Sequence, residues 1–116
     1  MHLEDAAQLA LNLMGRFGLL ENGWTFGFNR RRSQAGVCHF PTAHRAGRIQ
    51  LSAYYVVLNG EDDIRHTVLH ELAHALAGPV GYGPLWKAIC TRIGARPERC
   101  TRAAMPPGHW RAKCPS

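Results

Sequence analysis

The chain has 116 residues, with 14 lysines and arginines against 8 aspartates and glutamates, so its formal net charge is +6 at neutral pH. This length suits one modest core, and we expect residues 1–116 to form a single domain. The apolar N-terminal stretch contains Glu4 and Asp5 and lacks a preceding basic region, which argues against a signal peptide and a membrane-spanning helix. We therefore expect a cytoplasmic protein without a membrane partner, and assume a monomer.

The first half of the chain predicts one helix and a small sheet. Apolar side chains at three- and four-residue steps indicate an amphipathic scaffold helix over residues 1–18. Alternating patterns over 24–28 and 36–40 predict two strands joined as a hairpin, and 48–52 a third strand. We therefore expect a three-stranded antiparallel sheet over residues 24–52. The apolar residues 54–58 either continue the third strand or form a helical turn.

The second half predicts two further helices and a tail. Acidic residues at 61–63 suit the positive end of a helix dipole, and Gly78-Pro79 stops the helix predicted over residues 61–77. Pro84 suits the first turn of a helix over residues 84–94, in which Trp86 is expected to pack towards the core. Residues 97–116 are expected to form an irregular tail. The sequence therefore predicts an α+β fold.

The motif His70-Glu-Leu-Ala-His74 lies in the middle of the helix predicted over 61–77. Residues four apart lie on one helix face about one turn apart, so His70 and His74 can bind one ion from the same side. Glu71 is displaced by about 100° and can take a proton from an attacking water. The pattern predicts a zinc site with His70 and His74 as metal ligands and Glu71 as the catalytic general base. The plainer alternative is two histidines on an ordinary amphipathic helix.

The other face of this helix is expected to be buried. His66 extends the run of histidines, but it lies about 12 Å from His74 along the axis, whereas zinc sits about 2 Å from each ligand nitrogen. We therefore expect His66 to lie outside the ligand set. The apolar stripe that should pack into the core consists of Ile64, Val68, Leu69, Leu72 and Leu76.

Arginines gather in short runs. Arg30, Arg31 and Arg32 are consecutive, and Arg48 lies in the third predicted strand. A basic surface of this kind attracts polyanions, nucleic acid first, and Trp110 offers a ring for stacking on unpaired bases. DNA is therefore an expected partner, which would place the protein at the nucleoid. The alternative is that these arginines are solvated loop residues.

Several segments, in order, resemble the SprT-like metallopeptidase domain, whose eukaryotic relatives include the Spartan protease. The glycine-rich block that begins at Gly81 makes this resemblance more specific than the histidine motif alone. The resemblance implies a minimal zincin-like domain with one Zn²⁺ and, as substrates, proteins bound or crosslinked to DNA. The matching segments are residues 24–29, 36–38, 49–52, the HELAH helix, 81–86 and 94–97.

Domains of this family have a third histidine ligand in a Gly-His-Gly segment, and here the matching residue is Tyr82. A phenolate can bind zinc, but a neutral phenol is a poorer ligand than imidazole at neutral pH. Tyr82 is thus a candidate third metal position. As a hydroxyl donor it is also a candidate catalytic residue that stabilises a tetrahedral oxyanion. His109 is the alternative third ligand.

Many relatives continue into a zinc ribbon, and Cys114-Pro115 resembles the truncated start of its first ligand pair. A structural zinc needs four ligands, so we expect no ribbon within residues 1–116. Without a secretory signal the chain needs no disulfide framework. Free thiols are expected at Cys38, Cys90, Cys100 and Cys114.

Three functions fit these residues. The first is a zinc-dependent metallopeptidase in which Glu71 deprotonates the attacking water. The alternative is a catalytically weak or inactive zincin fold that serves as a nucleic-acid-binding or adaptor module, which Tyr82 and the missing ribbon favour. A weaker third possibility is a hydrolase that acts on a bond other than a peptide.

Overall fold

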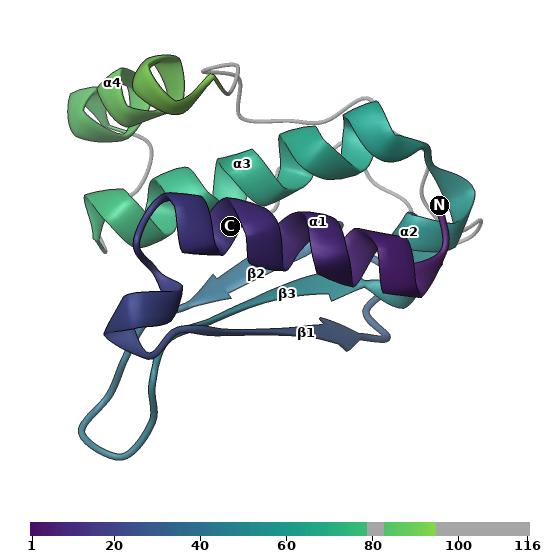
Figure 1. Cartoon of the computed structure of the whole chain (residues 1–116), viewed down its shortest axis with the longest axis horizontal. Coiled ribbons are helices and arrows are strands. Elements are labelled where there is room, and N and C mark those ends of the chain that lie inside the picture. The colour runs from purple at the N-terminus through teal and green to yellow at the C-terminus, as the bar shows by residue number, and fades with distance from the viewer. Residues whose placement is uncertain (79–82, 95–116) are drawn as a thin grey trace.

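The computed structural model describes residues 1–78 and 83–94, and its α+β architecture confirms the predicted fold class. Helices α1 and α3 lie side by side over one face of a three-stranded sheet, and α4 packs on α3 (Figure 1). No described helix combines the length and the apolar character that a bilayer crossing needs. The elements are α1 (Leu3–Arg16), a 3₁₀ turn (Leu20–Asn22), β1 (Thr25–Asn29), β2 (Gly36–His39), β3 (Arg48–Ser52), α2 (Ala53–Leu58), α3 (Glu61–Ala77) and α4 (Pro84–Ile93).

The sheet has the strand order β1-β3-β2, so the predicted antiparallel hairpin of the first two strands is wrong. β1 runs parallel to β3, with Phe26 opposite Ile49. β2 pairs with β3 in the antiparallel sense, with Cys38 opposite Ile49. A parallel pair needs a long crossover connection, and residues 30–47, which include β2, provide it. The sheet is therefore mixed, with β3 in the centre.

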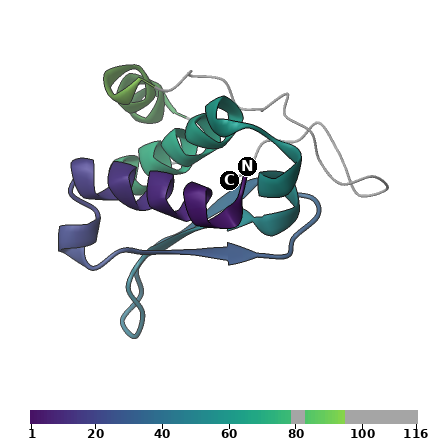
Figure 2. The same ribbon diagram turned by 45° about the vertical axis from the view of Figure 1, so that its right-hand side comes forward.

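β3 occupies the centre because its inward side chains are the most deeply buried ones of the sheet. Ile49 and Leu51 have no exposed surface, whereas Phe26 and Phe28 of β1 are only partly buried. A central strand has hydrogen-bonding partners on both edges and, here, helices over its inner face. Figure 2 shows the described helices on one side of the sheet. Because side chains alternate along a strand, Arg48 faces the side that these helices leave uncovered.

Ser52 ends β3 and starts α2, which decides the alternative for residues 54–58 in favour of a helix. Its hydroxyl accepts a hydrogen bond from the Tyr55 amide at 3.4 Å and donates one to the Arg31 carbonyl at 2.6 Å. A serine here satisfies an amide that the first helical turn leaves free. The Tyr55 hydroxyl lies 2.7 Å from Oγ1 of Thr67, and this buried hydrogen bond joins α2 to α3.

α3 has the bounds that the sequence predicts, and its middle is buried almost all round rather than along one stripe. Every residue from 67 to 74 is buried, because α1, the sheet and α4 all contact this helix. Ile64 and Val68 lie in the core as predicted. Leu76, however, is 38% exposed, so its place in the predicted apolar stripe is wrong. The covered part of α3 ends before its last turn.

Gly36 lets α3 approach β2 closely. A Cβ atom at this position would lie 3.0 Å from Cγ2 of Thr67, 3.2 Å from Cγ of Glu71 and 3.3 Å from Cδ2 of Leu51. These distances are shorter than ordinary carbon contacts, so a side chain would push the helix and strand apart. The absence of a side chain at residue 36 therefore sets the spacing between the sheet and the middle of α3.

We predict that Gly36→Ala lowers the free energy of unfolding by about 1–3 kcal/mol, because the added methyl group overpacks this contact. Gly27→Ala in β1 is the matched control, since a Cβ atom there has no neighbour within 4 Å. The control should leave stability unchanged or slightly higher. Urea unfolding of the three proteins measures both effects. Equal stability of the two variants would show that α3 and β2 are not in tight contact at residue 36.

Candidate metal and catalytic centre

The three motif side chains lie together in the buried middle of α3. His70 and His74 are each 6% exposed, and Glu71 is fully buried. The two imidazole ring centres are 5.8 Å apart, with ring planes inclined at 30°. Two imidazoles that share a tetrahedral zinc ion have ring centres about 5 Å apart, given nitrogen–zinc distances of about 2.0–2.1 Å. The spacing therefore fits a shared ion with little adjustment.

Trp86 of α4 packs against both imidazole rings. Its ring centre lies 4.8 Å from that of His70 and 5.3 Å from that of His74, and it stacks on the His74 ring with an interplanar angle of 29°. Trp86 is itself fully buried, as the sequence predicts, although its contact with the histidines was not foreseen. The indole restricts the rotation of both rings and forms one wall of the centre.

Glu71 is a buried carboxyl group. Neither of its oxygens has a hydrogen-bond partner among the described residues. Burial raises the pKa of Glu71 to about 8, because a carboxylate loses its hydration there. The group is thus a neutral acid at pH 7 unless a positive charge lies beside it. A nearby cation would favour the carboxylate, so this uncompensated side chain fits a metal site.

Both histidines are held in the form that binds metals. Burial, followed by the charges of His74 and His66, lowers the pKa of His70 to about 4. Burial also lowers the pKa of His74. Nε2 of each ring is shielded from solvent. Neutral imidazoles at pH 7 have a lone pair available for an ion, so no proton has to leave them before binding.

β2 forms the wall opposite Glu71. Gly36 contacts Glu71, and the thiol of Cys38 is close enough that, after burial, the Glu71 charge is the second cause that raises the pKa of Cys38 to about 12. A thiol that keeps its proton is a poor metal ligand. Cys38 and Cys90 are free, as predicted, whereas Cys100 and Cys114 lie outside the described residues. The glycine at the start of this alternating strand was the sequence signal of this wall.

The third ligand stays a prediction. Within residues 1–78 and 83–94, no three His, Cys, Asp or Glu side chains are placed to hold a metal together. His66 is partly buried one turn before His70 and adds no third position to such a group. Tyr82, His109 and Trp110 lie outside the described residues. His70 and His74 are therefore the described candidates for metal binding.

The predicted basic residues fall into two groups. Arg30, Arg31 and Arg32 are exposed in the connection after β1, where Arg31 donates to Oε1 of Gln34 at 2.8 Å. The Arg32 guanidinium lies 4.5 Å from the centre of the Tyr54 ring. Arg48 is half-buried in β3. The three consecutive arginines thus form an exposed edge, and Arg48 belongs to the uncovered face of the sheet.

Comparison with known families assigns the chain to a family. The SprT-like family model matches residues 6–105 of this chain. The chain belongs to the SprT-like family. Comparison with curated proteins gave no significant match, and neither did comparison with solved structures. The family match covers all described helices and strands from residue 6 onward, including the HELAH helix, and makes a metallopeptidase-type domain the function class of this SprT-like chain.

We predict that Glu71 lowers the stability of the metal-free protein as the pH rises. Its pKa is raised from 4.5 to about 8 in the folded state, so the group is protonated in both states well below pH 4.5. Between about pH 4.5 and pH 8 the unfolded chain loses the proton first, which lowers the stability of the fold. Glu71→Gln should be about as stable as the parent at pH 5 and more stable by a few kcal/mol at pH 8.

Urea unfolding of chelator-treated protein at both pH values tests this difference. Glu71 is not among the causes that lower the pKa values of His70 and His74, so the contributions of the two histidines should be the same in both proteins. A difference that stays constant from pH 5 to pH 8 would show that the Glu71 carboxylate is solvated in the folded protein.

Proposed function

We propose that this SprT-like protein is a zinc-dependent endopeptidase of the HExxH type. The observation that carries the proposal is the fully buried Glu71 carboxyl group, without a hydrogen-bond partner among the described residues, beside two neutral imidazoles. A structural core gains nothing from such a carboxyl group, because its burial is unfavourable. Beside a metal ion at a site of hydrolysis, by contrast, burial raises the pKa of a carboxylate and so makes it a better general base.

His70 and His74 would hold the ion through Nε2. When bound, zinc polarises the scissile carbonyl and makes the attacking water more acidic. Glu71 takes the proton of that water on a carboxylate oxygen and passes it to the nitrogen of the leaving amine. Trp86 keeps both imidazole rings oriented through its contacts at 4.8 and 5.3 Å. The buried surroundings exclude bulk water from Glu71, which strengthens each electrostatic interaction.

We infer that the substrates are proteins bound or crosslinked to DNA. Exposed arginines on the edge after β1 support this inference, since such a surface attracts the phosphate backbone without reading sequence. The net charge of +6 favours the same partner. On this proposal DNA brings the substrate to the centre, and the centre itself recognises only the peptide.

We predict that His70→Ala and His74→Ala each weaken zinc binding at least tenfold, because each variant loses one nitrogen–metal bond. Glu71→Gln should keep the metal and lose peptidase activity, because an amide cannot accept the proton. Zinc content by atomic spectroscopy and cleavage of an unfolded protein in the presence of DNA measure the two properties separately. Loss of zinc in Glu71→Gln would instead make Glu71 a ligand.

A second candidate function is a nucleic-acid-binding or adaptor module with little catalysis. The packing of Trp86 on both imidazoles favours it, because the indole narrows the approach to the ring nitrogens. A protein that stays metal-free in excess zinc, yet binds DNA in a salt-dependent way, would establish the module. One zinc per chain together with cleavage that requires Glu71 would exclude it.

Substitutions at Tyr82 distinguish these two functions further. The reason for choosing Tyr82 is its position in the sequence motif, because it lies outside the described residues. An imidazole at this position matches the third ligand of the family, so Tyr82→His should tighten zinc binding roughly tenfold. Tyr82→Phe should weaken zinc if the phenolate is a ligand. It should spare zinc and slow turnover if the hydroxyl stabilises the oxyanion. If neither variant changes zinc affinity or rate, Tyr82 has no part in the centre and His109 becomes the next candidate.

A further inference from the structure

A pocket that none of the motif residues lines lies at the end of the β2–β3 pair. Its volume is about 270 Å³, and it is lined by Cys38 and His39 of β2, by Arg48 of β3 and, between these strands, by Phe40, Thr42, Arg45 and Ala46. His39 and Arg48 are opposite each other in the strand register. The pocket is therefore distinct from the metal centre, although Cys38, whose pKa responds to Glu71, borders it from β2.

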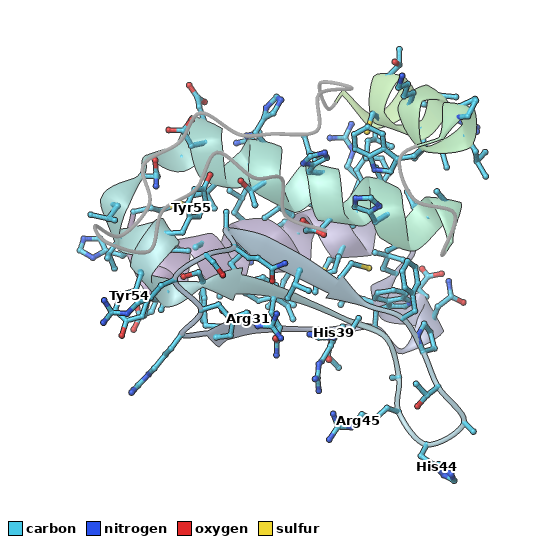
Figure 3. The ribbon with its side chains drawn as sticks, turned by 180° about the vertical axis from the view of Figure 1, so that it is seen from behind. Arg31, His39, His44, Arg45, Tyr54 and Tyr55 are labelled. Carbon is cyan, nitrogen blue, oxygen red and sulfur yellow. The ribbon has the colours of Figure 1, made fainter. Side chains whose placement is uncertain are left out.

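The pocket opens on the face of the sheet that the described helices do not cover. Gly36 faces α3, so alternation along the strands turns His39 and Arg48 to the opposite face. Figure 3 shows the His39 and Arg45 side chains on the side of the sheet away from α3, with Arg31 nearby on the same side. The pocket thus gathers His39 from β2, Arg45 from the following loop and Arg48 from β3.

No negative charge balances this cluster within the described chain. The pocket lining contains no carboxylate, and the salt bridge seen among the described residues joins Arg65 to Glu61 on α3. The pKa of His39 reflects, in part, the positive charges around it. Burial lowers the pKa of His39 first, Arg48 lowers it next, and Arg31 and Arg45 lower it further against the opposing hydrogen bond of Gln50.

Arg48 provides a donor that needs an anion. Its side chain is half-buried, and its Nε is shielded from solvent without a hydrogen-bond acceptor among the described residues. A buried donor of a charged group is unfavourable unless an acceptor meets it. A guanidinium group presents its N–H bonds as a fork that matches the oxygens of phosphate, and charged hydrogen bonds of this kind are the stronger ones.

We propose that this pocket binds a phosphate group, with Arg48 and Arg45 as the main donors and His39 in its wall. The volume lies below the roughly 300–1,000 Å³ of pockets that enclose whole small-molecule ligands, so the phosphate enters and the rest of the ligand stays outside. Two sources share this chemistry: a phosphodiester of a nucleic-acid backbone, and free phosphate. The proposal goes beyond the peptidase activity and stands without it.

The test follows the His39 imidazole signals by NMR while inorganic phosphate is added to the full chain at constant ionic strength. A saturable shift is expected, and Arg48→Gln or Arg45→Gln should weaken it at least about fivefold. Arg48→Lys should weaken it too, because lysine keeps the charge but lacks the guanidinium fork. Arg16→Gln is the matched control, since it removes one positive charge from α1, on the other side of the sheet. It should change the affinity less than about twofold.

The absence of a saturable shift, or an equal effect of Arg16→Gln and Arg48→Gln, would overturn the proposal. Circular dichroism checks the fold of each variant, and Arg45→Gln, on an exposed loop, supplies the test if the Arg48 variants do not fold. A second titration identifies the source of the phosphate. It uses an oligonucleotide whose phosphates are all internal phosphodiesters. If it shifts His39 and Arg48→Gln weakens it more than Arg16→Gln does, the ligand is a nucleic-acid backbone. If phosphate saturates and the oligonucleotide has no effect at His39, the ligand is free phosphate.

Discussion

The centre of this SprT-like protein depends on one close contact, the approach of α3 to β2 at Gly36. Because residue 36 has no side chain, the helix lies near enough to bury the Glu71 carboxyl group completely. The raised pKa of Glu71, the shielding of its oxygens and the proximity of Cys38 all follow from this spacing. An unpaired buried carboxyl group opposes folding. The surrounding apolar residues of α1, the sheet and α3 therefore have to offset it.

The mixed sheet gives β2 and β3 two different faces. Their inner residues, Gly36 and Ile49 among them, support α3 beneath the histidine motif, while the side chains of His39 and Arg48 point away from it. A strand pair separates neighbouring residues onto opposite faces by its pleat alone. The proposed cation site and the proposed anion site would thus lie on opposite faces of the same two strands, with Cys38 at the border of both.

Local patterns in the sequence predicted the helices well. The bounds of α3 follow from its acidic first turn and from Gly78-Pro79, both of which act within a few residues. The sheet order did not follow, because a period of two predicts a strand without naming its partner, and β3 takes the centre through burial of Ile49 and Leu51. The exposure of Leu76 was not predicted for a similar reason. Helical periodicity shows which face of α3 is apolar, but not how far along the helix the neighbouring elements cover that face.

Trp86 links the predicted and the unpredicted parts of the centre. Its place in the core follows from the apolar spacing of α4, but its contact with His70 and His74 arises only when α4 packs on α3. If the proposed ion binds, the indole has already oriented both rings, so less conformational entropy would be lost on binding. The same contact closes part of the approach to those nitrogens. Orientation and access therefore oppose each other at one side chain, and the balance between them decides whether the buried Glu71 serves catalysis.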